Sequence, residues 1–536
     1  MQNFNAPHSA AAHNFAQVPK ADIPRSSFDR SSGRKTTFNS GYLTPVFVDE
    51  VLPGDTFNLD MTAFVRLATP LHPFMDNMYL DSFFFFVPYR LVWDNWQKFN
   101  GEQRNPGDST SYVVPQLVST PVTGYANETI FDYMGLPTKV PGLSHSALPL
   151  RAYNLIYNEW FRDQNLQNSV VNNVGDGPDS VSDYALLRRG KRHDYFTSAL
   201  PWPQKGPSVA LPLSGNAPVT GIGFTGTTND SGAGLTYRES SPLADRTYTH
   251  AVFTNLASVI GIDQDQQGAS AKPKIYTDLS AVTAATINQL RQSFQIQKLY
   301  ERDARGGTRY TEIIRAHFGV TSPDARLQRP EYLGGGSSPL NITPVAQSSS
   351  TVNGSPQGNL AAFGTAVMKR HGFTKSFTEH GVIIGMVMAR ADLTYQQGLN
   401  RMWSRSTRWD FYWPALAMIG EQGILNKEIY AQGSADPEAD AALFGYQERF
   451  AEYRYRPSEI TGKLRSNDAA SLDSWHLSQK FTSLPALNAS FIVENPPVER
   501  VIAVPSEPQF IFDGFFKLNC ARPMPMYGVP GLIDHF

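Results

Sequence analysis

The sequence predicts a mainly β protein, and three features of the 536-residue chain support that prediction. Residues 79–87 carry no polar group on either face of a strand after Ser82, so a separate layer must cover each face. Apolar and polar residues alternate over 57–65 and over 510–518, which is typical of strands buried on one face. The 33 Phe, 23 Tyr, 38 Pro and 41 Gly residues favour strands and turns over helices.

The Phe-rich stretch is the predicted central strand of the core. Because side chains alternate along a strand, Leu80, Phe84 and Phe86 should point to one face and Phe83 and Phe85 to the other. Burial of each Phe contributes about 1.5–3 kcal/mol to the free energy of folding. We therefore expect these five residues to form a core strand that is covered on both sides.

The remaining elements follow from residue periodicity and from turn residues. Residues 1–40 show no apolar period and are expected to form an irregular arm. Apolar residues at helical spacing predict helices at 91–99, 149–164, 287–303 and 310–317. Two further strands are expected at 382–389 and 491–493. Glycine and serine runs predict flexible linkers at 334–338 and 348–358.

The charge balance argues against a protein that neutralises nucleic acid over its whole surface. The chain has 46 basic and 48 acidic residues, for a formal net charge of −2. The N-terminal arm is locally basic, and Arg25, Arg30, Arg34 and Lys35 are candidates for contacts with DNA phosphates. The alternative for so short a run is a solvated terminus without a binding role.

No motif predicts catalysis, a cofactor or a metal. Cys520 is the single cysteine, which excludes an internal disulfide framework and a Cys-rich zinc site. No zinc-protease helix, phosphate-binding lysine loop or nucleophile elbow is present. The longest apolar run, at 382–389, is far shorter than the ~20 residues that span a bilayer, so we expect no membrane insertion.

Three classes of protein fit these observations. A structural shell subunit explains the strands, the many aromatic residues and the missing catalytic motifs. A β-rich attachment or carbohydrate-binding protein explains nearly the same features. A carbohydrate-active enzyme would need two carboxylates in an aromatic cleft, which spacing along the chain cannot reveal.

Several long segments resemble one known family. They are NFAQVP at 14–19, VDEVLPGDT at 48–56, ERDARGGTRY at 301–310, RPEYLGG at 329–335 and FGYQER at 444–449. With these segments the chain resembles the major capsid proteins of gokushoviruses, which are small icosahedral single-stranded DNA bacteriophages of the microvirus family. The resemblance runs nearly from end to end and is weakest over 206–275.

The resemblance implies an eight-stranded viral jelly roll, a β-sandwich with large helical and loop insertions, repeated in the simplest icosahedral (T=1) shell. Residues 1–40 would form the arm, 41–204 and 281–536 the two parts of the jelly-roll core, and 205–280 a variable surface protrusion. The implied partners are further copies of the chain, an internal scaffolding protein, a pilot protein, a small basic DNA-binding protein, the single-stranded DNA genome and a host-surface receptor. The protein would be part of the virion and assemble in the bacterial cytoplasm without catalysing a reaction.

Overall fold

The computed structural model describes residues 24–207, 209, 219–220, 235–238, 245–248, 276–277, 287–307, 309–319, 328–354 and 356–527. The chain divides into two compact units. The larger combines the residues up to Pro203 with those from Thr308 onward, and the smaller runs from Gln204 to Gly307.

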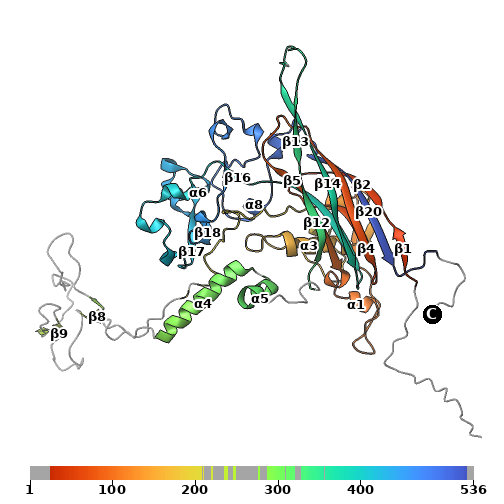
Figure 1. The fold of residues 1–536 in the computed structure, drawn as a ribbon. Helices are drawn as coiled ribbons and strands as arrows, with labels where there is room; N and C mark the ends of the chain where they lie inside the picture. Colours follow the sequence, from red (N-terminus) through yellow and green to blue (C-terminus); the bar gives the residue numbers. More distant parts are fainter. Residues whose placement is uncertain are drawn as a thin grey trace, which may run out of the picture. The chain divides into compact units, whose positions relative to one another are not determined.

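Two antiparallel sheets organise the larger unit (Figure 1). The six-stranded sheet contains β1 (Ser26–Asp29), β2 (Ser32–Phe38), β20 (Phe510–Arg522), β4 (Thr56–Leu67), β14 (Leu360–Ser376) and β13 (Asn341–Ala346). Its order is β1-β20-β4-β14-β13, and β2 also pairs with β20. The four-stranded sheet has the order β12 (Glu331–Pro339), β5 (Met78–Pro88), β15 (Gly381–Ala391) and β3 (Thr44–Val51).

Aromatic and aliphatic side chains from both sheets fill the space between them. Along β4 every second residue is buried, because the side chains of a strand alternate between the core and the outer face. The Phe47 ring of β3 lies 5.2 Å from the Phe516 ring of β20, between ring centroids. The Phe84 ring of β5 lies 5.6 Å from that of Phe373 in β14. The two sheets therefore share one core.

The Phe-rich strand, β5, contributes to two cores. Leu80, Phe84 and Phe86 belong to the core between the sheets. Phe85 lies in a second core on the opposite face of the four-stranded sheet, and Phe83 is half-buried beside it. Both faces of this strand are covered, as the alternation of its side chains predicts.

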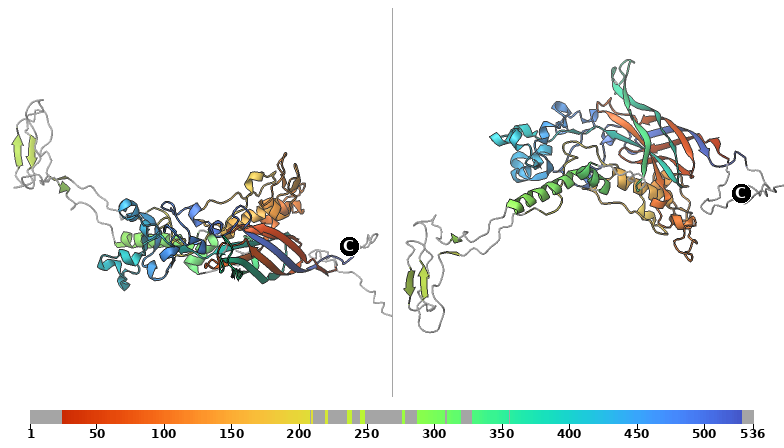
Figure 2. Two further views of the ribbon diagram at one scale, coloured as in Figure 1. Left: turned by 90° about the horizontal axis from the view of Figure 1, so that it is seen from above. Right: turned by 60° about the horizontal axis from the view of Figure 1, so that its bottom comes forward.

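A layer of short helices and loops covers the outer face of the four-stranded sheet. It includes α1 (Trp96–Phe99), α2 (Ile130–Met134) and α3 (Leu148–Ile156), which continues as a π-helical turn over Tyr157–Phe161. The views in Figure 2 show this orange-coloured layer on one side of the strands. Almost every residue of α3 is buried. The predicted 149–164 helix is therefore present but ends earlier than expected.

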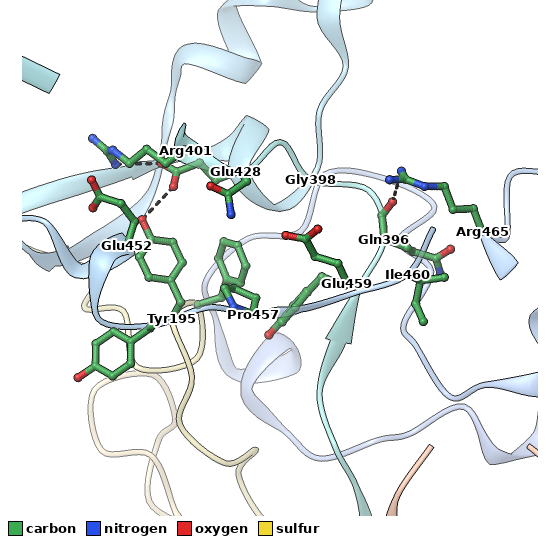
Figure 3. A pocket seen from close by; sticks show the side chains of 14 residues that line it. Tyr195, Gln396, Gly398, Arg401, Glu428, Glu452, Pro457, Glu459, Ile460 and Arg465 are labelled. Atoms are coloured by element: carbon green, nitrogen blue, oxygen red, sulfur yellow. Dashed lines mark hydrogen bonds and ion pairs between the residues drawn. The ribbon is translucent and has the colours of Figure 1, made fainter. Parts of the chain in front are cut away.

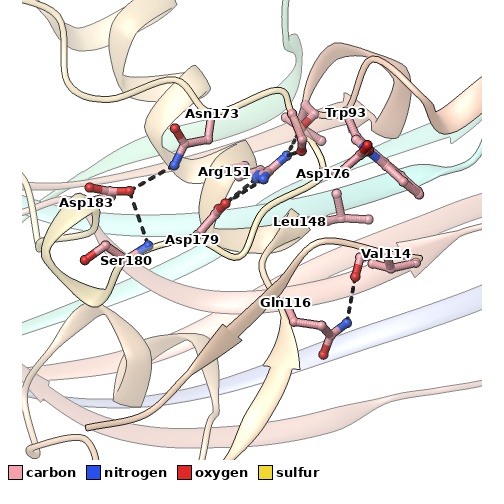
Figure 4. Close-up of polar contacts among 12 residues, drawn as sticks. Trp93, Val114, Gln116, Leu148, Arg151, Asn173, Asp176, Asp179, Ser180 and Asp183 are labelled. Atoms are coloured by element: carbon pink, nitrogen blue, oxygen red, sulfur yellow. Dashed lines mark hydrogen bonds and ion pairs between the residues drawn. The ribbon is translucent and has the colours of Figure 1, made fainter. Parts of the chain in front are cut away.

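Arg151 of α3 is the polar centre of this layer (Figure 4). Its guanidinium donates to both carboxylate oxygens of Asp179, at 2.8 and 2.6 Å, and to the carbonyl oxygens of Val92 at 3.0 Å and Gly175 at 2.8 Å. The side chains of the ion pair are 0% and 2% exposed. A hydrogen bond from the Trp93 indole N–H to Asp176, at 2.7 Å, attaches the same loop to the segment that precedes α1. These bonds fix the loop at 170–184 beneath α3.

The glycine-rich segment at 334–338, predicted to be a flexible linker, is instead part of strand β12. This prediction was wrong because glycine is required there by packing. A Cβ atom on Gly335 would lie 2.0 Å from the carbonyl oxygen of Ser82, and one on Gly334 would lie 2.5 Å from that of Gly372. The glycines therefore let β12 approach β5 and β14 closely.

Two further expectations need correction. The arm expected to be irregular over 1–40 contains β1 and β2, both paired with β20. Phe38 is the buried anchor, and its ring stacks on Phe510 at 5.1 Å. Of the residues expected to form a strand at 491–493, the first two are instead part of α8 (Ala489–Ile492), because the Asn488 side chain caps the backbone N–H groups of Ser490 and Phe491. Val493 makes only an isolated β-bridge with Gly190.

The described residues include other short helices. These are α5 (Tyr310–Phe318), α6 (Asn426–Ile429) and α7 (Pro437–Ala441). The first was expected at 310–317, and Gly319, in the left-handed conformation, caps its C-terminal end. In the smaller unit, β9 (Leu235–Arg238) pairs with β10 (Asp245–Tyr248), and β8 (Val219–Thr220) pairs with β11 (Tyr276–Thr277). This unit also contains the helix α4 (Ile287–Gly306), which the sequence analysis expected at 287–303.

His371 lies inside the sandwich and makes its stability depend on pH. The ring is 5% exposed and hydrogen-bonds Ser82 of β5 at 2.7 Å and Ser338 of β12 at 3.0 Å. Burial lowers the pKa of His371 and outweighs the opposing charges of nearby aspartates. The unfolded chain then binds a proton at higher pH than the folded chain.

The free energy of unfolding should therefore fall as the pH drops below about 6.5, which is the pKa of histidine in the unfolded chain. The fall should end once the pH is below the pKa of His371 in the folded chain. Chemical denaturation of the purified subunit at pH 7.5 and at lower pH should show this loss of stability. In His371→Gln the part of the pH dependence that is due to His371 should be absent. His193→Gln changes an exposed ring and is the control. An identical pH profile for wild type and His371→Gln would contradict the assignment.

Candidate functional site

The most unusual surface of the described chain is a run of exposed apolar side chains at residues 399–419, called here the aromatic segment. Its large exposed residues are Leu399, Met402, Trp403, Trp409, Phe411, Tyr412, Trp413, Met418 and Ile419. Trp403 is 70% exposed and Met418 is 95% exposed. Scattered apolar residues are normal on a surface, but so many large exposed ones within one short segment indicate an interaction surface.

The aromatic segment is held in a fixed shape by 3-10 turns and arginines. Its turns cover Arg401–Ser404, Arg408–Asp410 and Pro414–Leu416. The carboxylate of Asp410 accepts hydrogen bonds from the backbone of Ser406 and Thr407, which lower the pKa of Asp410 to about 2. The Arg408 guanidinium lies 4.6 Å from the centre of the Trp413 ring. A preformed apolar surface loses little conformational entropy on association.

A cavity of about 60 Å³ lies next to this segment (Figure 3). It is lined by aromatic, amide, arginine and carboxylate side chains, a mixture that resembles a carbohydrate site. Two of its three carboxylates, Glu428 and Glu452, are however held in ion pairs. Glu428 accepts hydrogen bonds from Arg401 at 3.0 Å and from Tyr195 at 2.9 Å, and burial raises its pKa. Glu452 pairs with Arg405 at 3.4 Å.

These ion pairs hold Arg401 and Arg405 of the aromatic segment in place. Arg401 also donates to the carbonyl oxygen of Gly423 at 2.7 Å. Arg405 lies over the ring of Tyr453 at 4.4 Å. Glu428 and Glu452 therefore form a polar support for the surface and are not the free acid and base pair that glycoside hydrolysis requires.

The four candidate DNA-contacting residues lie on or beside β1 and β2, and each has an intramolecular partner. Arg25 hydrogen-bonds the Thr56 hydroxyl. Arg30 forms a two-bond ion pair with Asp49 at 2.5 and 2.9 Å. The remaining two differ strongly in exposure.

Arg34 is the least accessible of the four. It donates to the carbonyl oxygen of Tyr133 at 2.5 Å, and burial lowers its pKa. Lys35 pairs with Asp513 at 2.9 Å, but its side chain is 80% exposed. The structure therefore spreads these residues along a sheet edge and leaves Lys35 largely exposed.

The described ranges contain no cluster of three or more His, Cys, Asp or Glu side chains that could hold a metal ion. Cys520 is buried in β20, and burial raises its thiol pKa. Among the described helices, none is both long and apolar enough to cross a membrane. Two stretches that match only the letters of a dinucleotide-binding loop (221–226) and the first letters of a calcium loop (263–268) lie outside the described residues.

Comparison with known proteins identifies the family. The family model described as "Capsid protein (F protein)", of phages, matches residues 16–532. The chain belongs to this phage capsid protein family. It is 52% identical over 528 residues to capsid protein VP1 of Bdellovibrio phage phiMH2K, with 98% of each chain covered. Identity is 48% to capsid protein VP1 of Chlamydia phage 1 and 38% to that of Spiroplasma virus 4, again over 98% of each chain.

The phage capsid protein family matches the resemblance found in the sequence. The chain is a major capsid protein of the small single-stranded DNA microviruses, located in the virion, and it is a structural protein rather than an enzyme. The aromatic segment was not predicted, because tryptophan in a Phe- and Tyr-rich chain is usually part of the core. Its signal in the sequence is the density of large apolar residues between arginines at 401–413.

Proposed function

We propose that this capsid protein builds a T=1 icosahedral shell from an eight-stranded jelly roll. The eight strands are β2, β3, β4, β5, β12, β14, β15 and β20. The supporting observation is the path of the chain between the two sheets. Successive strands lie in opposite sheets, except that β5 and β12 are neighbours in one sheet, and the last strand lies between the first and the third of the eight. This order supports the double Greek key of a jelly roll.

We further propose that the aromatic segment is a contact between copies of the chain in the shell. A closed shell needs extensive interfaces, and its subunits must bury apolar surface that a monomer exposes. The segment offers aromatic side chains with arginines among them, which is the composition enriched at such interfaces. Because the turns and the ion pairs of Arg401 and Arg405 already fix it, association does not require the segment to fold.

The test is to replace exposed residues of this surface without disturbing the core. Trp403→Ser combined with Met418→Ser should leave a soluble, folded subunit and reduce shell formation at least tenfold, because exposed anchors contribute about 2 kcal/mol or more to an interface. Sedimentation and electron microscopy measure shells, and circular dichroism measures folding. Val122→Ser, which changes an 85% exposed residue elsewhere, is the matched control. Normal shells from the double variant would exclude this surface from assembly.

The shell would enclose the single-stranded DNA genome. A formal net charge of −2 cannot balance a packaged genome, which supports a separate small basic DNA-binding protein as the main neutralising partner. We expect an internal scaffolding protein and a pilot protein as further assembly partners, in line with the resemblance. The protrusion proposed at 205–280 would carry the contact with the host-surface receptor.

The arm would add a weak, salt-sensitive contact with DNA. Arg25→Gln combined with Lys35→Gln should lower genome retention as the salt concentration rises. The slope of the logarithm of DNA affinity against the logarithm of salt concentration should become shallower by about one to two units. Arg30→Gln and Arg34→Gln should instead destabilise the subunit, because their partners are Asp49 and the Tyr133 carbonyl. DNA content of purified particles is the measurement. Unchanged retention in the Arg25 and Lys35 variant would assign the arm to structure alone.

A further inference from the structure

A small cavity in the larger unit brings together an amine, an amide and a carboxyl group. It has a volume of about 10 Å³ and lies where strand β15 ends, next to Ala391. Lys191, Gln479 and Glu494, which come from separate parts of the chain, all line it. The cavity has room for about one molecule of the size of water. A lysine amine beside a side-chain carbonyl group is a nucleophile beside an electrophile.

The amine and the amide are in direct contact. The Nζ atom of Lys191 donates a hydrogen bond to Oε1 of Gln479 at 2.9 Å. The amide carbon, Cδ, is about 1.2 Å from that oxygen. Because the terminal torsion of a glutamine side chain is broad, the amide group can turn its carbon toward the amine. A small rotation therefore brings Nζ to the distance of about 3–3.5 Å from Cδ at which atoms react.

Hydrogen bonds of the backbone hold the segments that carry these groups. The Lys191 N–H donates to the carbonyl oxygen of Ile492 at 2.6 Å, and Glu494 lies two residues further along the same segment. The side-chain amide of Gln396 donates to the backbone carbonyl oxygen of Gln479 at 3.2 Å. Because the groups are already positioned by the fold, much of the entropic cost of bringing them together is absent.

Burial favours the uncharged forms of the amine and the carboxyl group. Lys191 is 6% exposed and Glu494 is 3% exposed. Burial lowers the pKa of Lys191 to about 8, against the opposing charges of Glu494 and Asp194. Burial also raises the pKa of Glu494, against the opposing charge of Lys191. An uncharged amine is nucleophilic, and a protonated carboxyl group can act as a general acid.

The hydrogen bonds of Lys191 lead to the same conclusion. A lysine ammonium group has three N–H donors, and a buried donor without an acceptor is costly. Within the described part of the chain, the Gln479 amide is the one hydrogen-bond acceptor of this amine. On another side Nζ lies 4.3 Å from the ring centre of Phe491, which shields it from water. The site therefore holds an amine against an amide with few other partners.

We propose that Lys191 and Gln479 form an isopeptide bond within the subunit, and that Glu494 transfers the protons. The lone pair of Nζ attacks Cδ of Gln479, while the amide oxygen takes the proton of the Glu494 carboxyl group. The resulting carboxylate then removes a proton from Nζ.

The second half of the reaction releases ammonia. Glu494 passes its proton to the amide nitrogen, the bond between that nitrogen and Cδ breaks, and ammonia leaves. The hydroxyl proton on the former amide oxygen returns to Glu494, so that a carbonyl group and the carboxyl group are restored. One amine and one carboxamide thus become one secondary amide and one ammonia, without an oxidant or a cofactor.

The bond would brace each subunit, whether or not it is assembled in a shell. It would join residues 288 positions apart and so enclose strands β12, β14 and β15 in a covalent loop. A covalent cross-link restricts the unfolded chain, and a longer loop is restricted more. With Cys520 as its single cysteine, the chain cannot form an internal disulfide for this purpose. An amide bond also persists in a reducing cytoplasm.

Mass spectrometry of the purified full-length subunit tests the proposal. The wild type should be lighter than its sequence mass by one ammonia. Trypsin should release a branched peptide that joins residues 190–192 to residues 466–480, because a modified Lys191 is not cleaved. The branched peptide distinguishes this bond from ammonia loss at an Asn-Gly sequence such as Asn100-Gly101. An unlinked wild type, after long incubation at about pH 9 where the amine is uncharged, would overturn the proposal.

Three substitutions separate the roles of the groups. Lys191→Arg and Gln479→Met each remove a reacting atom and should abolish the branched peptide. Glu494→Gln keeps the shape of the side chain but cannot transfer a proton, so that bond formation should slow about a hundredfold or more. Lys480→Arg changes the exposed lysine beside Gln479 and is the matched control, which should form the bond as the wild type does. Circular dichroism checks the folding of each variant.

Other outcomes would contradict parts of the assignment. Bond formation at the wild-type rate in Glu494→Gln would exclude proton transfer by Glu494. Lys98 donates to Asn95 at 3.2 Å without such a cavity, and equal linkage of that pair would show that contact alone is sufficient. If a variant does not fold, the branched peptide of the wild type still decides whether the bond exists. Shell formation is measured separately, so a missing bond leaves the capsid function intact.

Discussion

Replacing either Phe84 or Phe85 by serine should deprive the subunit of a soluble folded state. The two rings are 0% and 1% exposed. Truncation of a buried Phe costs about 3–5 kcal/mol, and a buried hydroxyl without a partner adds to that cost. The total stability of a typical domain is only about 5–15 kcal/mol. The adjacent positions should be equally sensitive, because they occupy different cores.

The environments of the two rings explain this expectation. Phe84 packs against Phe47 and Phe373 between the two sheets, with ring centroids 6.3 and 5.6 Å away. Phe85 packs on the opposite face against Trp160 at 5.3 Å and Phe161 at 5.7 Å. Neither ring can move to solvent without separating a packed layer.

The measurement is the soluble fraction after expression, followed by circular dichroism and sedimentation. Phe64→Ser is the matched control, because Phe64 lies on β4 with its side chain on the outer face and is 49% exposed. That variant should remain soluble. Normal shells from Phe84→Ser or Phe85→Ser would mean that the corresponding face of β5 is open.

The elements whose side chains carry a periodic pattern could be predicted from the sequence. Strands β4, β5, β15 and β20 bury their apolar residues on definite faces, so that their hydrophobic pattern is visible without a structure. The end of α5 was also predictable, since Gly319 takes the left-handed conformation that favours glycine. In these cases the local signal and the tertiary environment agree.

Other elements depend on a partner that the local sequence does not contain. Strands β1 and β2 have few apolar residues and form because the backbone of β20 offers them hydrogen bonds. In β12 the glycines at 334–336 meet Ser82, His371 and Gly372, which lie far away in the sequence. Composition alone makes such a segment resemble a linker.

The same limit applied to the functional residues. Tryptophan in a Phe- and Tyr-rich chain is usually a core residue, but the 3-10 turns leave Trp403 and Trp409 70% and 58% exposed. Lys191 and Gln479, whose side chains are in contact, lie 288 positions apart in the sequence. No local pattern could therefore indicate that these two groups meet.

Arg151→Met should destabilise the subunit by about 3–5 kcal/mol, because it leaves the Asp179 carboxylate buried without its partner. The carbonyl oxygens of Val92 and Gly175 would lose a hydrogen-bond donor at the same time. Methionine preserves much of the side-chain volume, so that the loss reports on charge and hydrogen bonding more than on packing. Chemical denaturation of the purified subunit at neutral pH is the measurement.

Two further variants isolate the cause. Lys35→Met breaks an ion pair with Asp513 whose side chains are 80% and 53% exposed, and it should cost less than about 1 kcal/mol. Arg151→Met combined with Asp179→Leu removes both buried charges and should recover part of the stability lost in the single variant. A double variant that is less stable than Arg151→Met would show that packing of the Asp179 loop, rather than the unpaired charge, dominates the loss.

The pH dependence gives an independent check of the same pair. Burial alone would raise the pKa of Asp179, but hydrogen bonds from Arg151 and Tyr184 outweigh it and hold the pKa below its ordinary value. The stabilisation by the pair is therefore fully present above a pH of about 3.9, which is the pKa of aspartate in the unfolded chain. It is lost as the pH falls through the pKa of Asp179 in the folded chain. In Arg151→Met, burial without the arginine should instead raise the pKa of Asp179. The variant should then lose stability at a higher pH than the wild type, and an acid unfolding midpoint equal to that of the wild type would contradict the role assigned to Arg151.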